Sequence, residues 1–249
     1  MKRLIRTELL KLRTTPVFPI GVAAMALAAA LVTVAVFGAA GHQGNEPLGD
    51  HSLAQAVGAP ASIVTTVALL LGVLGMAGEF RHQTITTTFL GTPRRREVVA
   101  SKLLAHAILG ATIATMTIAI TAAIAIPWLN SAGVAVHVDG DVTGVAAGLL
   151  LSTALYAALG VAVGALVRNQ TAAAIVVLVW LLAVEGLLAN VLGSPWLVHW
   201  LPAGVGGVIV HMHSGDDTVP MWAATMTLVG YVAAFATAGT RFIVNRDVT

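Results

Sequence analysis

Apolar runs almost free of charge divide the chain into six segments that are each long enough to cross a bilayer. They cover Val17 to Ala40, Pro60 to Gly78, Leu103 to Leu129, Val142 to Val167, Thr171 to Gly193 and Pro220 to Thr240. About 20 helical residues span a hydrocarbon core ~30 Å thick. The pattern therefore predicts an all-α membrane protein with six transmembrane helices.

Composition agrees with this pattern. Hydrophobic residues make up 57% of the chain and Asp, Glu, Lys and Arg only 10%, whereas a soluble domain carries about 25% charged residues. The first apolar run is longer than the ~7–15 residues of a signal peptide, so we expect a retained span. The chain has no cysteine, which excludes disulfides, thiolate metal ligands and a cysteine nucleophile.

The basic residues lie in alternate connecting segments. All 13 are Lys2, Arg3, Arg6, Lys11, Arg13, Arg81, Arg94, Arg95, Arg96, Lys102, Arg168, Arg241 and Arg246. The other three segments, 41–59, 130–141 and 194–219, carry only acidic charges. Short loops rich in Lys and Arg stay in the cytoplasm, so the sequence predicts that both termini are cytoplasmic. Basic residues beside apolar segments favour anionic lipids over nucleic acid as a partner.

One apolar segment competes with this count. Trp196 to Met212 is 17 residues long but is interrupted by Pro202 and several glycines. As a seventh span it would move Arg241 and Arg246 outside. We therefore interpret residues 194–219 as an outer re-entrant or interfacial hairpin, where a broken helix is tolerated because protein or water satisfies its backbone.

The first fifteen residues have the pattern of a basic amphipathic helix. Ile5, Leu9 and Leu12 fall on one helical face, and the basic residues fall elsewhere. Such a helix lies in the headgroup region of a membrane. Two interpretations remain open: a flank that only sets topology, or a mechanical elbow between a cytoplasmic partner and the bundle.

The segment from Glu79 to Lys102 is predicted to be a cytoplasmic helical hairpin. Gly91 ends one helix, and Thr92 with Pro93 begins the next, since threonine suits the cap and proline the first helical position. Three successive arginines, 94–96, lie near the tip. They either bind lipid phosphates or form part of a docking surface for a soluble protein, because arginine pairs with carboxylates in a bidentate manner.

This hairpin resembles that of the ABC transporter permeases of the type-two export class. The residues that match the family pattern in order are Glu79, Thr84, Ile85, Leu90, Pro93, Arg95 and Lys102. The N-terminal residues that resemble the family's opening helix are Arg6, Glu8, Lys11, Leu12 and Arg13. Gln83 stands where the family commonly has glycine. In architecture the resemblance covers the whole chain, residues 1–249, as a single permease domain.

The resemblance implies a division of labour. The permease forms the substrate path in a bacterial plasma membrane, two copies pair as a homodimer, and two separate ATPase subunits bind ATP and Mg. The chain has no Gly-x4-Gly-Lys-Ser/Thr phosphate loop, so we expect no cofactor or ATPase activity of its own. The implied ATPase-coupling surface consists of Glu79, Arg81, His82, Gln83, Thr84, Ile85, Arg94, Arg95 and Arg96.

Few side chains inside the spans could carry chemistry. Glu185 is the only acidic residue within a predicted span, and because intramembrane carboxylates are costly we consider both substrate contact or gating and a hydrogen-bonded helix contact. His106 is interpreted as a satisfied polar contact. His211, His213, Asp216 and Asp217 are interpreted as solvated rather than as a metal site.

Two other functions share parts of this pattern. An intramembrane protease or haem enzyme would need clustered Glu or His side chains, which the spans do not supply. A non-transporting immunity or sensory protein would share the same topology. The sequence does not identify the substrate.

Overall fold

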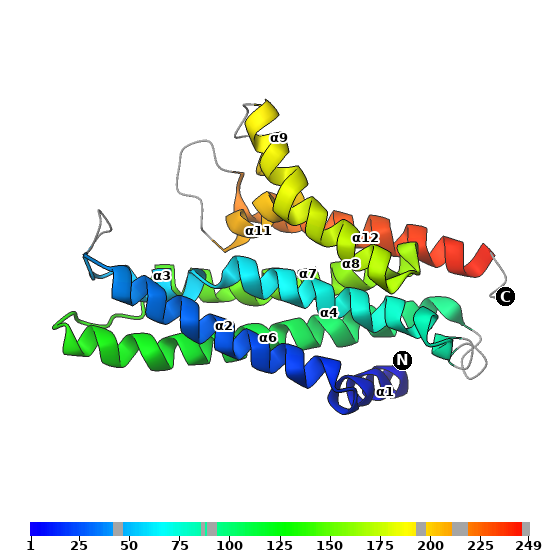
Figure 1. Cartoon of the computed structure of the whole chain (residues 1–249), viewed down its shortest axis with the longest axis horizontal. Coiled ribbons are helices and arrows are strands. Elements are labelled where there is room, and N and C mark those ends of the chain that lie inside the picture. Colours follow the sequence, from blue (N-terminus) through cyan, green and yellow to red (C-terminus); the bar gives the residue numbers. More distant parts are fainter. Residues whose placement is uncertain (42–46, 86–87, 89–93, 193–197, 211–218, 246–249) are drawn as a thin grey trace.

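The chain forms a long bundle of helices in a computed structural model, which describes residues 1–41, 47–85, 88, 94–192, 198–210 and 219–245 (Figure 1). No strand occurs among these described residues. Six helical segments within them are long and apolar enough to cross a membrane. They are Val17–Ala39, Ser52–Arg81, Arg95–Ser131, Gly140–Val167, Gln170–Val191 and Met221–Ile243. The six spans expected from the sequence are therefore confirmed by length and composition.

Two of these segments begin earlier than the apolar runs. The second starts with a short helix, α3 (Ser52–Gly58), which precedes α4 (Ala61–Arg81). The third, α6 (Arg95–Ser131), extends eight residues beyond the predicted start at Leu103. The predicted cap at Thr92 and Pro93 lies outside the described residues.

α7 (Gly140–Val167) occupies the centre and packs most closely against α4. Two glycines face each other across this contact. A Cβ atom on Gly160 would lie 1.9 Å from the Leu69 carbonyl oxygen, and one on Gly72 would lie 2.1 Å from the Ala157 carbonyl oxygen. Both obstacles are backbone atoms, so only glycine permits this separation. Close approach through small residues is how helices associate in lipid, where hydrophobic burial gives little driving force.

Other helices surround this central pair. α6 and α12 (Met221–Asn245) each pack against α7, and α2 (Val17–Ala39) packs against α6. The fifth span consists of α8 (Gln170–Val179), a π-helical turn η1 (Trp180–Val184) and α9 (Glu185–Leu192). α9 projects away from the rest of the bundle in Figure 1.

The bundle has two distinct ends. α1 (Lys2–Thr14), the connection from α4 to α6 and the C-terminal end of α12 lie together at what we call the basic end (Figure 1). α3 and the start of α7 lie at the opposite end, as does the short helix α11 (Pro202–Ile209). α11 falls within the predicted hairpin 194–219, of which residues 194–197 and 211–218 lie outside the described part.

Candidate functional site

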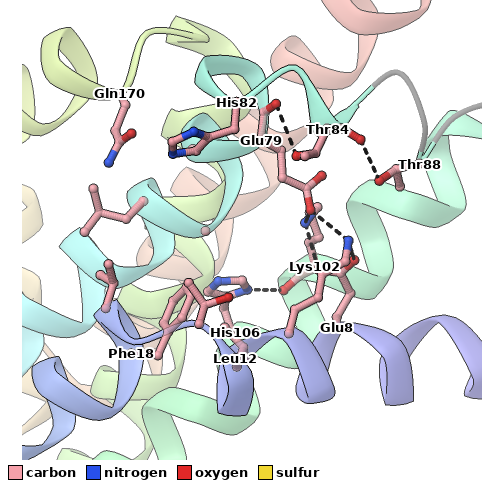
Figure 2. A pocket seen from close by; sticks show the side chains of 16 residues that line it. Glu8, Leu12, Phe18, Glu79, His82, Thr84, Thr88, Lys102, His106 and Gln170 are labelled. Carbon is pink, nitrogen blue, oxygen red and sulfur yellow. Dashed lines mark hydrogen bonds and ion pairs between the residues drawn. The ribbon is translucent and has the colours of Figure 1, made fainter.

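Four charged side chains from three helices meet at the basic end. Lys102 on α6 places its Nζ 2.7 Å from Glu8 Oε2 on α1 and 2.7 Å from Glu79 Oε1 on α4. Lys11 Nζ lies 3.0 Å from Glu8 Oε1 and 2.9 Å from Glu79 Oε1. Figure 2 shows the contacts of Lys102 with both carboxylates. We call these four residues the charge cluster.

The charge cluster is buried and electrically balanced. The side chain of Lys102 is 1% exposed, and those of Glu8 and Glu79 are 7% and 12% exposed, while Lys11 reaches the surface. An unpaired charge in such a place is very costly, whereas a well hydrogen-bonded set is tolerated. The cluster therefore joins α1, α4 and α6 at one point, because each charge requires partners from another helix.

The pKa values of the two α1 residues show how the cluster holds its charges. Burial raises the pKa of the Glu8 carboxyl, but the ammonium groups of Lys102 and Lys11 outweigh it and keep this pKa below its usual value. Burial lowers the pKa of Lys11, but Glu79 and Glu8 outweigh it and keep this pKa above its usual value. The stability contributed by Glu8 is lost as pH falls through its folded-state pKa, and that contributed by Lys11 is lost as pH rises through its own. The attachment of α1 is thus strongest between these limits.

A cavity of about 520 Å³ adjoins the cluster. Its apolar wall includes Leu12 and Phe18, and its polar wall includes His82 and Gln170. His106 lines it too. Its Nδ1 lies 2.9 Å from the Lys102 carbonyl oxygen, and its ring packs edge-on against Phe18. The expected polar contact of His106 is therefore present at Nδ1, whereas its buried Nε2 has no hydrogen-bond partner among the described residues.

The residues predicted to form the ATPase-coupling surface divide into inward and outward groups. Glu79 belongs to the charge cluster, and Ile85 is 1% exposed and packs against Val98 and Ile243. Arg81, His82, Gln83 and Thr84 are exposed on the connection after α4. Glu79 and Ile85 therefore anchor the connection, and the other four form its accessible part.

The three successive arginines occupy different surroundings. Arg94 pairs with Glu97 at 3.0 Å, and Arg95 Nη1 donates to the Ile243 carbonyl oxygen at the end of α12 at 2.5 Å. Arg96 is exposed. Arg95 thus satisfies a carbonyl in the last turn of α12, where a cation also suits the helix dipole. The α1 residues Arg6 and Arg13 are exposed on the same end of the bundle.

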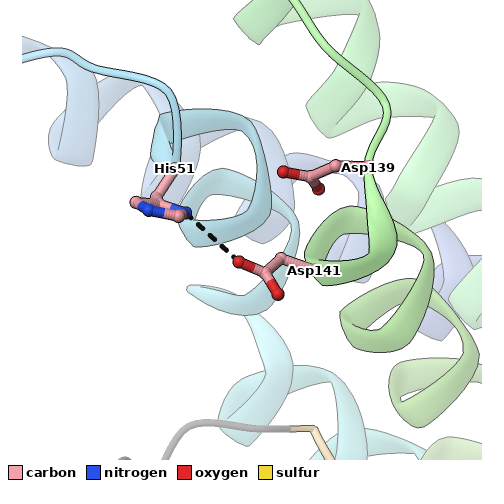
Figure 3. A group of neighbouring side chains, drawn as sticks. All are labelled: His51, Asp139 and Asp141. Atoms are coloured by element: carbon pink, nitrogen blue, oxygen red, sulfur yellow. Dashed lines mark ion pairs between the residues drawn. The ribbon is translucent and has the colours of Figure 1, made fainter.

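A second polar group lies at the opposite end. His51 Nδ1 is 3.2 Å from Asp141 Oδ2, and Asp139 lies beside them, as Figure 3 shows. Asp139 caps α7 by accepting from the Val142 N–H at 3.0 Å, and this hydrogen bond keeps its pKa below the usual value. All three side chains are exposed, so the ion pair adds little stability. The metal candidates His211, His213, Asp216 and Asp217 lie outside the described residues.

Glu185 is a helix cap. It is 4% exposed, and its Oε2 accepts from the Ala203 N–H at 2.8 Å, at the start of α11. Tyr231 donates to the Trp200 carbonyl oxygen at 2.9 Å, and Tyr156 donates to the Pro202 carbonyl oxygen. Three spans therefore hold the start of α11. Of the two interpretations of Glu185, the hydrogen-bonded contact is present in the structure.

A family model described as an ABC-2 family transporter protein matches residues 4–186. The chain belongs to this family. The match runs from α1 through the α4–α6 connection into the fifth span, so it includes every member of the charge cluster. The ABC-2 chain is a multi-pass membrane protein of the transport permease type. A search of curated proteins gave no match.

The family resemblance included Glu8, Lys11, Glu79 and Lys102, but the sequence did not show that they bind one another. Lys102 was expected only to lead into the third span. A signal was present: Glu8 is the only acidic residue among the first fifteen, and Lys11 follows it at the i+3 spacing that brings side chains together. The sequence does not indicate which distant helices supply the other partners, because that depends on how the helices of the ABC-2 chain pack.

Replacing Gln83 with glycine is expected to stabilise the ABC-2 chain. Gln83 has φ +55°, a left-handed conformation that costs a residue with a side chain ~1 kcal/mol and glycine much less. We expect Gln83→Gly to raise the thermal unfolding midpoint in detergent. His82→Gly is the control, because His82 has φ −92° and its replacement should lower the midpoint. A lower midpoint for Gln83→Gly would contradict this account.

Glu185→Leu is expected to lower the free energy of unfolding by ~2 kcal/mol, because the hydrogen bond between the buried Glu185 carboxylate and the Ala203 N–H is lost. Glu185→Gln keeps an acceptor oxygen and should lose much less. Unfolding of both variants in detergent measures how much the cap stabilises the protein, and a transport assay of the same variants tests for a substrate contact. Loss of transport in Glu185→Gln at unchanged stability would support substrate contact instead.

Proposed function

We propose that the chain is the membrane subunit of an ATP-driven ABC exporter in a bacterial plasma membrane. In this proposal two copies pair as a homodimer that forms the substrate path, and each copy binds one ATPase subunit, which supplies the ATP and Mg sites. The family match and the missing phosphate loop support the need for an ATPase in trans.

The proposed orientation puts the basic end in the cytoplasm. All described Lys and Arg residues belong to segments at that end, which fits the preference of cytoplasmic loops for these residues. α1 then lies along the cytoplasmic headgroups, and residues 194–219 form the outer hairpin that contains α11. The accessible part of the connection after α4, with Arg94, faces the ATPase.

The coupling proposal rests on the charge cluster. Glu79 lies in the last turn of α4, just before the proposed docking surface, and through Lys102 and Lys11 it is tied to α1. A displacement of the connection by the ATPase is therefore transmitted to α1 and α6 together, because separating them would leave buried charges without partners. We infer that this cluster converts ATPase movement into movement of the first three spans.

Co-purification tests the proposal. The tagged chain, crosslinked in native membranes and then solubilised, is expected to retain a soluble protein with a nucleotide-binding site, and ATP hydrolysis should require both proteins. Charge reversal at Arg81 and Arg94 should reduce recovery of this partner. Reversal at Arg3 and Arg13, which are equally exposed on α1, is the matched control. Absence of any nucleotide-binding partner under crosslinking would overturn the assignment.

The orientation has a separate test that uses the absence of native cysteine. Thr14→Cys places a thiol at the basic end, and Ser131→Cys places one at the opposite end; both positions are exposed. A membrane-impermeant maleimide applied to intact cells should label only Ser131→Cys. Labelling of Thr14→Cys in intact cells would reverse the proposed topology.

A further inference from the structure

A groove of about 430 Å³ runs between α6 and α12 at the basic end. Both helices pack against α7 and touch each other much less, so a furrow remains between them. The residues that line it from α6 are Arg96, Val99, Ala100 and Leu103, and those from α12 are Ala233, Ala236, Thr237, Thr240 and Arg241. The lining residues of each helix recur at helical spacing and so lie on one face of that helix. The groove therefore runs along the helix axes.

The groove is polar at one end only. Arg96 and Arg241 are exposed beside the opening of the groove, near the hydrogen bond between Arg95 and the last turn of α12. Deeper in, the lining is apolar or small. The Thr237 and Thr240 hydroxyls donate to carbonyls of their own helix at 3.0 and 2.6 Å, so their hydrogens are already used. None of the lining residues is acidic.

We propose that this groove binds one anionic phospholipid of the cytoplasmic leaflet, with the phosphate between Arg96 and Arg241 and one acyl chain against α6 and α12. Arginine suits phosphate because its planar fork donates two parallel hydrogen bonds. The helix from Arg96 to Leu103 rises by ~10 Å, about a third of the hydrocarbon core. A small soluble anion would use the mouth alone, and the apolar furrow behind it fits an attached chain. The choice of leaflet rests on the proposed orientation.

The bound lipid is a second link between α6 and α12 at the basic end. Arg95 already fixes the end of α12 to the start of α6. A phosphate between the two neighbouring arginines joins the same two helices a second time and relieves the repulsion between their like charges. The lipid therefore stabilises the sixth span next to the α4–α6 connection.

Native mass spectrometry of the purified chain, without any ATPase, tests the site. The probes are phosphatidylglycerol and phosphatidylcholine with identical acyl chains, and inorganic phosphate. We expect one phosphatidylglycerol retained per chain and weaker retention of phosphatidylcholine. Removing both charges in Arg96→Gln/Arg241→Gln should weaken phosphatidylglycerol retention by about tenfold. Arg3→Gln/Arg13→Gln removes two exposed charges from α1, away from the groove, and should reduce only weakly held lipid while one phosphatidylglycerol per chain stays retained.

A second pair of variants tests the furrow. Ala233→Phe fills the exposed floor of the groove and should reduce phosphatidylglycerol retention, whereas Ala24→Phe on the exposed face of α2 should not. Equal binding of both lipids, unchanged retention in the arginine or Ala233 variants, or full competition by inorganic phosphate would each overturn the proposal. Unchanged lipid retention in Arg96→Gln/Arg241→Gln, together with loss of the ATPase from this variant in the separate crosslinking pull-down, would instead identify a protein-docking surface. Because lipid is measured without the ATPase, failure here leaves the transport proposal intact.

Discussion

Lys102→Met is expected to lower the free energy of unfolding by ~3–5 kcal/mol, the range found when one partner of a buried ion pair is removed. The substitution keeps the volume of the side chain but leaves Glu8 and Glu79, both largely buried, without their shared cation. α1 should detach first, because Lys11 alone then holds it to α4. Denaturant or thermal unfolding in mild detergent measures the loss.

Two further variants separate charge from packing. Lys11→Met should cost less, because Lys11 is 41% exposed and Lys102 still bridges both carboxylates. The triple variant Glu8→Gln/Glu79→Gln/Lys102→Met removes the three largely buried charges together and leaves only the partly exposed Lys11 charged. It should recover much of the lost stability, since neutral buried side chains of similar volume are tolerated. If the triple variant were no more stable than Lys102→Met, packing rather than unpaired charge would explain the loss. If the triple variant is stable but no longer couples ATP hydrolysis to transport, the cluster is needed for function as well.

Gly160→Leu is expected to prevent the accumulation of folded protein. Its Cβ would lie 1.9 Å from the Leu69 carbonyl oxygen and 2.8 Å from the Val73 amide nitrogen. Helix backbone cannot rotate aside as a side chain can, so α4 and α7 must separate along their main contact. Overpacking of a core typically lowers the free energy of unfolding by ~1–3 kcal/mol and sometimes more. We expect the cost of separating α4 from α7 to reach or exceed the upper limit of that range.

Gly230→Leu is the matched control for this prediction. Gly230 also lies within a span, but no heavy atom comes within 4 Å of its added Cβ. We expect it to fold normally and to gain ~1 kcal/mol of helix propensity at most. Yield of monodisperse protein on size-exclusion chromatography in detergent compares the two. Normal recovery of Gly160→Leu would mean that α4 and α7 do not pack as closely as described.

The spans could be predicted from sequence because their signal is strong and local. The first and fourth spans end within one residue of the apolar runs that predicted them. The early start of α6 at Arg95 agrees with the helix start predicted near Thr92 and Pro93. α4 ends at Arg81 and does not continue directly towards Gly91 as predicted, because the chain turns at His82 and Gln83; Gly91 itself lies outside the described residues. α3 was missed, since residues 52–58 were assigned to a connecting segment on the basis of polarity.

The site was only partly predictable, because its contacts join distant parts of the chain. Glu79 was predicted as part of a docking surface, but it turns inward to Lys102. Glu185 stood out because of its cost in a membrane, yet nothing local indicated that it would cap a helix 18 residues later. His51 and Asp141 lie in different connections, and only the packing of α3 against α7 brings them together.

The π-helical turn before Glu185 has a consequence for the register of the fifth span. A π turn acts as one residue inserted into an α-helix, and each α-helical residue advances the side-chain direction by ~100°. If residues 180–184 were all kept but wound as regular α-helix, α9 would rotate by about that angle relative to α8. The carboxylate of Glu185 would then be aimed away from the amide of Ala203. Deleting one residue of the turn at the same time would restore the direction of the carboxylate, because the deletion removes the extra residue that the wide turn accommodates.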